Sequence, residues 1–437
     1  SKASKLILKP GQMVGFFVTV GCMTSFAELT TMDVGGYIER FVEPTTRVAL
    51  IEEVEDADSK GIPLCVIGGG SNMLASDDEF HGVVIRDARR NIIVPDEAAP
   101  VEGGDYTVHV NAEAGVNWDD LVQFCVERGL EGLEGLSGIP GTVGASVVQN
   151  IGAYGQEVAS AVESVEVWDR EEKKTLDMSN VDMQFGYRFS LLKRSMYKAP
   201  GVPNAQYYPT PRYIVLSVTF ALVHTGTGTV NYPQLASALN VNLHDRMPID
   251  RIRAAVLEVR ASKGMLEDAT RYREPIMMGT KRADQVEAAI AAQHAFREQH
   301  DGAARDMIID IASDTGTNSD PNRRSCGSFF MNPIISEADA ARLPEDAPRF
   351  PATLPDGSTG VKTSAAWLID HAGFHKGYKL SDDARAGLST LHTLSITNRG
   401  GATCNDIVKL ADAIRDGVRK QFGVTLIPEP VLVNVTL

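Results

Sequence analysis

Apolar residues recur along the chain at the spacings that regular secondary structure produces. In three segments they lie three and four positions apart, which predicts amphipathic helices with one buried face. These helices are expected at residues 117–128, through Trp118, Leu121, Val122 and Cys125; at 249–263, through Ile252, Ala255, Val256 and Val259; and at 406–421, through Ile407, Leu410, Ala411, Ile414 and Val418.

Shorter apolar or alternating runs predict strands between these helices. The continuous run at 63–67 indicates a buried strand, and 83–85, 106–110, 164–168 and 214–220 are expected to form strands as well. Helices and strands that mix in this order predict an α+β fold.

Two glycine-rich loops interrupt these elements. Gly68-Gly69-Gly70-Ser71-Asn72 follows the strand expected at 63–67, and the segment from Gly138 to Gly155 contains five glycines in eighteen residues. Glycine lets backbone amides approach a ligand that side chains would exclude, which suits a diphosphate. Neither loop has the glycine spacing of a Rossmann or P-loop site. Together they predict one large dinucleotide ligand, whereas either loop alone is also explained by tight turns.

Length and charge narrow the class of protein. A chain of 437 residues that is 43% hydrophobic is expected to form two or three domains with a sizeable core. A net charge of −15 argues against nucleic-acid binding, so local cations and amides must hold any anionic ligand. Lysines ahead of the apolar run 13–20 mimic a signal peptide, but the run is too short to span a bilayer. We therefore expect an N-terminal extension ahead of a start near Met23, no membrane partner and a cytoplasmic location.

The cysteines and histidines do not indicate a metal site. The five cysteines are scattered without C-x-x-C spacing, which argues against zinc and against a disulfide framework. His371 and His375 lie four residues apart, but Gly373 between them weakens a helix and no H-E-x-x-H glutamate accompanies them. No metal is predicted, and Cys326 is interpreted as a bystander thiol.

Several uncommon strings occur in a fixed order along the chain. They are residues 26–36, the two glycine loops, Phe185-Gly-Tyr-Arg188 with Ser190 and Lys193, Gly327 to Pro333, Ala366 to Asp370, and Pro428-Glu429. Together they resemble the family of UDP-N-acetylenolpyruvoylglucosamine reductases, bacterial flavoenzymes of peptidoglycan precursor synthesis, in the longer class that has a tyrosine loop. The resemblance spans roughly residues 26 to 435.

The resemblance implies a domain organisation. It consists of an FAD-binding half of the vanillyl-alcohol-oxidase/PCMH type and a C-terminal α+β substrate domain. The expected parts are an extension at 1–25, an FAD-binding region at 26–263 with two subdomains that meet near residue 87, a substrate-binding domain at 264–422, and a C-terminal strand at 423–437 that carries Glu429. Residues 268–322 match nothing in the family pattern, and we interpret them as a solvated surface insertion, partly disordered, with a helical stretch at 283–300.

The resemblance also assigns binding residues. FAD is expected at the two loops, on Gly68, Gly69, Gly70, Ser71, Asn72, Met73, Pro140, Gly141, Thr142, Gly144, Ala145, Ser146, Asn150, Gly152, Ala153, Tyr154 and Gly155. For the substrate, Tyr187 is expected near the sugar or nicotinamide, Tyr232 on a mobile loop over the diphosphate, Lys263 beside substrate and nicotinamide, and Asn332 on the uracil or ribose. An exposed lysine at a helix end is the alternative interpretation of Lys263.

Three residues are expected to carry the chemistry. Hydride reduction of an enol ether carboxylate requires stabilisation of the developing charge and a proton donor. The resemblance assigns the proton donor to Ser328 and the stabilising groups to Arg188 and Glu429. A serine hydroxyl is a weak acid, but an enolate in contact with it is basic enough to take its proton. The alternatives are a surface cation for Arg188 and an edge strand between two prolines for Glu429.

The expected function is the NADPH-dependent reduction of UDP-N-acetylglucosamine enolpyruvate to UDP-N-acetylmuramate through FAD, by a monomeric enzyme. One alternative is a flavin-dependent sugar or lactone oxidase of the same fold, although such enzymes often tether flavin through His or Cys and the first loop has neither. A non-catalytic flavin or nucleotide-sugar sensor is the other, because Pro430 departs from the aliphatic residue expected after the glutamate.

Overall fold

The computed structural model describes residues 24–95, 106–196, 209–267, 282–301, 320–354 and 357–437. The extension expected at 1–25 lies almost wholly outside these residues, as does most of the predicted insertion apart from its helical stretch. Within them, helices and strands alternate in a mixed order and the predicted α+β class is confirmed. None of the described helices is long and apolar enough to cross a membrane.

A small parallel sheet begins the molecule. Its strands follow the order β1 (Ile38–Val42), β4 (Phe80–Ile85) and β2 (Leu64–Val66). The strand expected at 63–67 is therefore present, with Leu64 and Cys65 buried and Val66 exposed. The helix α2 (Arg47–Lys60) connects β1 to β2 and packs its apolar side against β2 and β4. A short helix, α1 (Phe26–Leu29), precedes this sheet and begins with a capping box between Ser25 and Glu28.

A larger antiparallel sheet follows. Its order is β11 (Lys174–Ser179), β10 (Val162–Asp169), β12 (Tyr213–His224), β6 (Thr107–Glu113) and β5 (Ile92–Ile93), with β7 (Leu130–Glu131) also paired to β12. The helices α3 (Trp118–Glu127) and α4 (Val143–Gln149) share a core with this sheet. The predicted helix face is confirmed, because Trp118, Leu121, Val122 and Cys125 are all buried.

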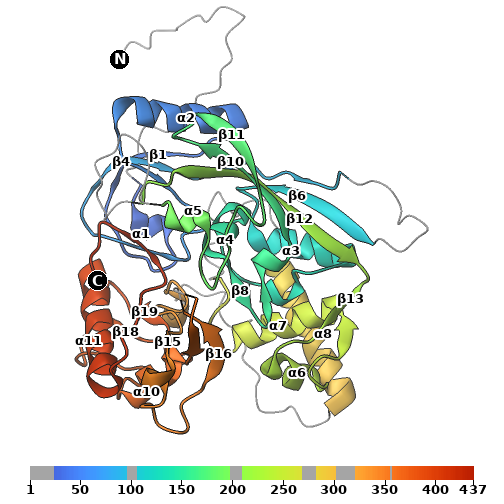
Figure 1. Cartoon of the computed structure of the whole chain (residues 1–437), viewed down its shortest axis with the longest axis vertical. Coiled ribbons are helices and arrows are strands. Elements are labelled where there is room, and N and C mark those ends of the chain that lie inside the picture. Colours follow the sequence, from blue (N-terminus) through green and yellow to red (C-terminus); the bar gives the residue numbers. More distant parts are fainter. Residues whose placement is uncertain (1–23, 96–105, 197–208, 268–281, 302–319, 355–356) are drawn as a thin grey trace, which may run out of the picture.

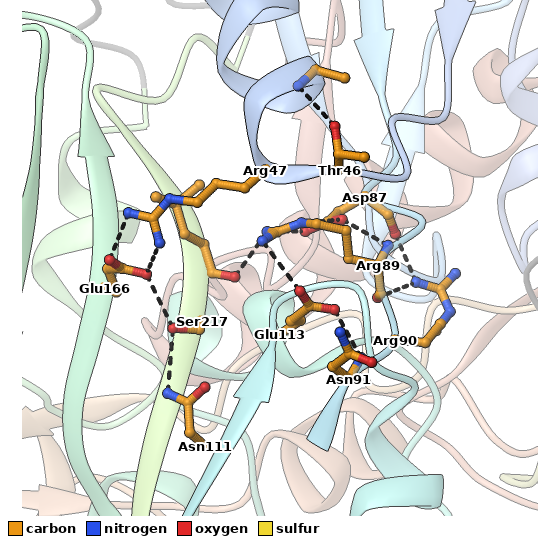
Figure 2. A network of polar contacts seen from close by, with 12 residues as sticks. Thr46, Arg47, Asp87, Arg89, Arg90, Asn91, Asn111, Glu113, Glu166 and Ser217 are labelled. Atoms are coloured by element: carbon orange, nitrogen blue, oxygen red, sulfur yellow. Dashed lines mark hydrogen bonds and ion pairs between the residues drawn. The ribbon is translucent and has the colours of Figure 1, made fainter. Parts of the chain in front are cut away.

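A polar network joins the two sheets (Figure 2). Arg47 of α2 donates two hydrogen bonds of 2.7 Å to the Glu166 carboxylate of β10. Arg89, between β4 and β5, donates from Nε and Nη2 to the two carboxylate oxygens of Asp87, and Nη2 also donates to the Leu216 carbonyl of β12. Arg89 and Asp87 are both buried, so these charges depend on one another for hydrogen bonds. The network therefore fixes how the two sheets are oriented.

Helices α6 (Pro233–Leu239), α7 (Ile249–Ala261) and α8 (Arg282–Asp301) form a third region, beside the antiparallel pair of β13 (Thr227–Thr229) and β14 (Arg246–Pro248). Figure 1 shows it at the lower right, in yellow and gold. The helical stretch of the predicted insertion is α8, and one of its faces packs on α7 while many of its other residues are exposed. Val286 and Ile290 are buried in one cluster with Leu257 and Ala261 of α7. The apolar residues of α8 are spaced so that they share one face of the helix, and this explains why the helix packs although a solvated segment was expected.

The C-terminal domain lies at the lower left of Figure 1, in orange and red. It contains the antiparallel sheet β15 (Ile334–Ser336), β17 (Thr359–Lys362) and β16 (Phe350–Thr353), the short helix α9 (Glu337–Ala340), α10 (Ala365–His371), the pair β18 (Ala386–Leu388) and β19 (Ile396–Asn398), and α11 (Cys404–Phe422). The predicted apolar face of α11 is buried, and Gly423 ends the helix with a φ of 71°.

The end of the chain returns to the N-terminal half. There β20 (Val431–Val433) pairs in parallel with β3 (Met73–Ala75), the strand that directly follows the first glycine loop. Glu429 precedes β20 instead of lying in it, and it is flanked by Pro430 and by Pro428, which forms an isolated antiparallel bridge with Phe330. Smaller elements complete the fold: α5 (Leu191–Arg194), the hairpin β8 (Gly152–Ala153) and β9 (Gln156–Glu157), and short 3₁₀ turns at Glu134–Leu136, Val158–Ser160 and Pro321–Arg323.

Candidate functional site

A cavity of about 800 Å³ lies where these regions meet. Its walls come from both glycine loops, from the large sheet, from the end of α7 and from the segments around Ser328 and Glu429. Every residue predicted for catalysis, for the substrate or for FAD lines this cavity, with the exception of Asn150. Its size lies in the upper part of the range for cofactor and ligand sites.

Asn150 has a structural position instead. It ends α4 in the left-handed conformation with a φ of 48° and is fully buried. Its side chain donates to the Gly186 carbonyl at 2.8 Å and accepts from the Ala159 N–H at 3.1 Å. Asn150 therefore ties the end of α4 to the segment that carries Arg188.

The two glycine loops touch one another. The Ser71 hydroxyl donates to the Pro140 carbonyl at 3.0 Å, and a Cβ on Gly69 would lie 2.8 Å from the Gly141 Cα. Within the described part of the chain, the N–H groups of Gly70, Ser71 and Asn72 have no hydrogen-bond acceptor. Unpaired amides beside a cavity, with no side chain in the way, fit a diphosphate.

The first turn of α4 offers fewer donors than the sequence indicates. The Val143 and Gly144 N–H groups already donate to the Val116 and Ala114 carbonyls, at 2.9 Å in each case. A helix N-terminus binds anions through such N–H groups when they are unpaired. The N–H groups of Val143 and Gly144 are therefore not available to an anion.

Arg188 and Glu429 meet in the cavity from distant parts of the sequence. Arg188 Nε lies 3.0 Å from Glu429 Oε1, and the two side chains are only 19% and 14% exposed. A second guanidinium nitrogen of Arg188 donates to the Gly152 carbonyl at 2.7 Å. Arg188 itself has a φ of 53°, a conformation that non-glycine residues seldom adopt. A positive charge is thus held rigidly beside a carboxylate.

Ser328 lies on a loop that runs beside the Glu429 segment. The Glu429 N–H donates to the Phe329 carbonyl at 2.9 Å, and the Phe329 N–H donates to the Leu394 carbonyl at 2.8 Å. Both Phe329 and Phe330 are buried, so the loop is anchored immediately after Ser328. Burial raises the pKa of the neighbouring Cys326 thiol to about 12, which keeps it protonated and unreactive.

Tyr187 and Asn332 lie close to one another on the wall next to Arg188. The Asn332 side chain accepts from the Ala365 N–H at the start of α10, at 2.9 Å. The Arg188 guanidinium and the Lys362 ammonium lie 5.4 and 5.0 Å from the centre of the Tyr187 ring. Burial raises the pKa of Tyr187, so its hydroxyl remains a hydrogen-bond donor.

Lys263 and Tyr232 lie on the wall formed by α6 and α7. Lys263 follows the end of α7 and donates to the Gln234 side chain at 2.7 Å. Burial, together with the nearby Arg260, lowers the pKa of Lys263. Tyr232 precedes α6 and packs edge-on against Tyr154, with ring centres 5.5 Å apart. Lys263 is half-buried in the cavity wall. The alternative interpretation from the sequence was a lysine exposed at a helix end.

Sequence reasoning assigned no role to several polar residues of the site. Gln149, Arg260 and His392 line the cavity, and Lys193 lies behind Glu429. The position of Arg260 three residues before Lys263 is a usable signal in the sequence, because the helix predicted at 249–263 would place both residues on one side. His392 belongs to none of the recognised strings. Burial lowers its pKa to about 4, and its Nδ1 accepts from the Leu394 N–H at 3.0 Å, so its imidazole is neutral.

The chain was compared with known proteins. Residues 320–433 match the family described as "UDP-N-acetylenolpyruvoylglucosamine reductase, C-terminal domain", and residues 38–177 match the family described as "FAD binding domain". Among curated proteins, the UDP-N-acetylenolpyruvoylglucosamine reductase of Thermobifida fusca is 37% identical over 94% of this chain and 97% of its own length. That of Salinispora arenicola is 38% identical over 93% and 94%.

One solved structure supports the fold. The UDP-N-acetylenolpyruvylglucosamine reductase of Thermus caldophilus matches with a TM-score of 0.50 and 23% identity, over 93% of this chain and 97% of that one.

Among the described residues, no group of three histidine, cysteine, aspartate or glutamate side chains is arranged to hold a metal ion.

Proposed function

The chain belongs to the family of UDP-N-acetylenolpyruvoylglucosamine reductases, and from this premise we propose how its residues divide the work. It is an FAD-dependent oxidoreductase that reduces UDP-N-acetylglucosamine enolpyruvate to UDP-N-acetylmuramate in peptidoglycan precursor synthesis, with NADPH as the reductant. When bound, FAD supplies a hydride acceptor for NADPH and a hydride donor for the enolpyruvyl carbon.

We assign FAD binding to the two glycine loops. The unpaired amides of Gly70, Ser71 and Asn72 would hold the diphosphate, and the second loop would close over it. The predicted cofactor residues other than Asn150 contribute to this wall. Because the overall charge is −15, these amides also compensate for a field that disfavours anions.

We assign the chemistry to Ser328, Arg188 and Glu429. Arg188 binds the substrate carboxylate and, with Glu429, stabilises the negative charge that develops next to it. Ser328 then donates its proton to the enolate-like carbon. The observation that carries this assignment is the Arg188–Glu429 ion pair at 3.0 Å, on a segment hydrogen-bonded directly to the Ser328 loop.

We assign substrate binding to Tyr187, Tyr232, Lys263 and Asn332, which line the walls on either side of the catalytic residues. Lys263 provides a cation for the UDP diphosphate and the nicotinamide cofactor. Tyr232 is 39% exposed at the start of α6, a position from which it can close over a bound ligand. We also propose that residues 26–263 bind FAD and that 264–422 and 423–437 complete the substrate side. We propose a cytoplasmic location, and we propose a monomer because one chain supplies the walls of the cavity.

The test of the assignment is Ser328→Ala in stopped-flow experiments. Flavin reduction by NADPH should be nearly unchanged, while flavin reoxidation by the enolpyruvyl substrate should slow by ~10²–10⁴-fold, because a positioned acid contributes about that much. Ser237→Ala, on the exposed side of α6, is the matched control. If Ser328→Ala reoxidises as fast as the control, Ser328 is not the proton donor.

A further inference from the structure

A buried hydrogen-bonded chain lies behind the catalytic carboxylate. The Lys193 ammonium donates to Gln149 Oε1 at 2.6 Å, and Gln149 Nε2 donates to Glu429 Oε1 at 3.0 Å. Lys193 also donates to the backbone carbonyls of Arg188, at 3.4 Å, and of Glu429, at 3.5 Å. Each of its three N–H groups thus has an acceptor, and two of these acceptors belong to the residues assigned to the developing charge.

The charge on Lys193 decides which way the Gln149 amide faces. A protonated amine has donors only, so the amide must present its oxygen to Lys193. The nitrogen of the same amide then faces Glu429 and donates to it. With its amide reversed, Gln149 would direct a carbonyl oxygen at a carboxylate, which is repulsive. Burial lowers the pKa of Lys193; Glu429 opposes this shift by favouring the charged form, and Arg188 adds to it.

The two oxygens of Glu429 are consequently different. Oε1 accepts a hydrogen bond from Gln149 Nε2 and forms an ion pair with Arg188 Nε, both at 3.0 Å. Within the residues that the structure describes, no hydrogen bond engages Oε2. Because Oε1 already has these two partners, any contact of Glu429 with the substrate is left to Oε2.

We propose that Lys193 is a positioning residue for the reductase reaction. By orienting Gln149, it anchors Glu429 through Oε1 and directs Oε2 toward the reacting substrate. This inference rests on the role assigned to Glu429 in the proposed function. Lys193 does not contact the substrate in this arrangement, and it acts only through Gln149 and Glu429.

The experiment compares Lys193→Met, which removes the donors at similar volume, with Lys193→Arg, which keeps a cationic donor. Lys174→Met, on an exposed strand, is the matched control. Lys193→Met should slow flavin reoxidation by substrate roughly 10- to 100-fold, the loss expected for one hydrogen bond to a charged group, while flavin reduction by NADPH and substrate affinity stay near the control values. Lys193→Arg should recover part of the rate.

A double mutant shows whether Lys193 acts through Glu429 or affects the reaction independently of it. Glu429→Gln alone should slow reoxidation, and adding Lys193→Met should slow it no further, because both act through one carboxylate. Gln149→Leu breaks the same chain and gives a second route if Lys193→Met fails to fold, which thermal unfolding reveals. It should reproduce the loss in reoxidation.

The possible failures are distinguishable. If Glu429→Gln slows reoxidation but Lys193→Met and Gln149→Leu behave like the control, the positioning role is wrong and the proposed function stands. Losses that multiply in the double mutant contradict it as well. If Glu429→Gln itself leaves reoxidation unchanged, the role assigned to Glu429 is wrong, and the role of Lys193 falls with it.

Discussion

Several residues in or next to the cavity wall have backbone conformations that residues other than glycine rarely adopt. Arg188, Tyr154 and Asn150 have φ values of 53°, 48° and 48°. Arg188 lies in a tight turn in which the Gly186 and Phe189 backbones exchange hydrogen bonds of 3.0 Å. Such conformations persist only where the surroundings enforce them, and they concentrate at functional sites. The direction of the Arg188 side chain is thus set by its backbone as well as by its ion pair.

His392 provides a pH-dependent prediction. Its folded pKa of about 4 lies below the ordinary value near 6.5, because burial, Lys263 and Lys376 disfavour its charged form. As pH falls from about 6.5 to about 4, the unfolded chain therefore binds a proton that the folded chain does not, and stability is lost over that window. His392→Gln, which keeps an acceptor for the Leu394 N–H, should lose less stability in denaturant titrations between about pH 7 and about pH 4. An equal loss in both proteins would show that His392 does not contribute.

Among the elements, α8 is the one whose position changes the interpretation of the chain. Its Val286 and Ile290 are buried against α7, and Arg297 of α8 lies 2.8 Å from the Glu258 carboxylate of α7. The end of α7 supplies Arg260 and Lys263 to the cavity. The helical part of the insertion thus supports an element of the site.

Ile290→Ala tests this packing. Truncation of a buried isoleucine typically costs about 2–5 kcal/mol of unfolding free energy, because it loses apolar contact and leaves a cavity. Ile93→Ala is the matched control, since Ile93 is 57% exposed on β5 and should cost about 0.5 kcal/mol or less. Urea unfolding measures both. A cost for Ile290→Ala equal to that of the control would restore the interpretation of a solvated insertion.

In the whole molecule, the cavity lies at the junction of every region. The first glycine loop connects the small sheet to β3, β3 pairs with the C-terminal β20, and the second loop belongs to the large-sheet core. A ligand that binds this junction only in the folded chain stabilises all the regions together. FAD is therefore expected to raise the unfolding temperature of the protein.

Gly69→Val examines that linkage. Its Cβ would lie 2.8 Å from the Gly141 Cα, so the two loops would separate and their amides would no longer converge on a diphosphate. The purified variant should lack the flavin absorbance of the parent and should unfold at a lower temperature. Flavin-stripped parent protein is the control, because added FAD should raise its unfolding temperature and leave that of the variant unchanged. Full yellow colour in Gly69→Val would mean that the loops do not hold the cofactor.

The sequence by itself determined the local structure and the chemical inventory. The three predicted helices and the main strands are present because the periodicity of apolar residues depends only on neighbouring residues. The glycine loops and the strings around Arg188, Ser328 and Glu429 were recognisable for a related reason: their residue types and order are uncommon along any chain. These features placed the chain in its family before any contact was known.

Only the tertiary structure decided how these parts meet. The structure accommodates Pro430 where an aliphatic residue was expected. The N–H groups of Glu429 and Val431 donate to Phe329 and Asn72, and no hydrogen bond is required from the residue between them. The hydrogen bonds of Lys193 to Gln149 and Glu429, and the packing of α8 on α7, likewise join segments far apart in sequence. No periodicity encodes such contacts, since they depend on how the chain is routed between its sheets and on which side chains that route brings within hydrogen-bonding distance.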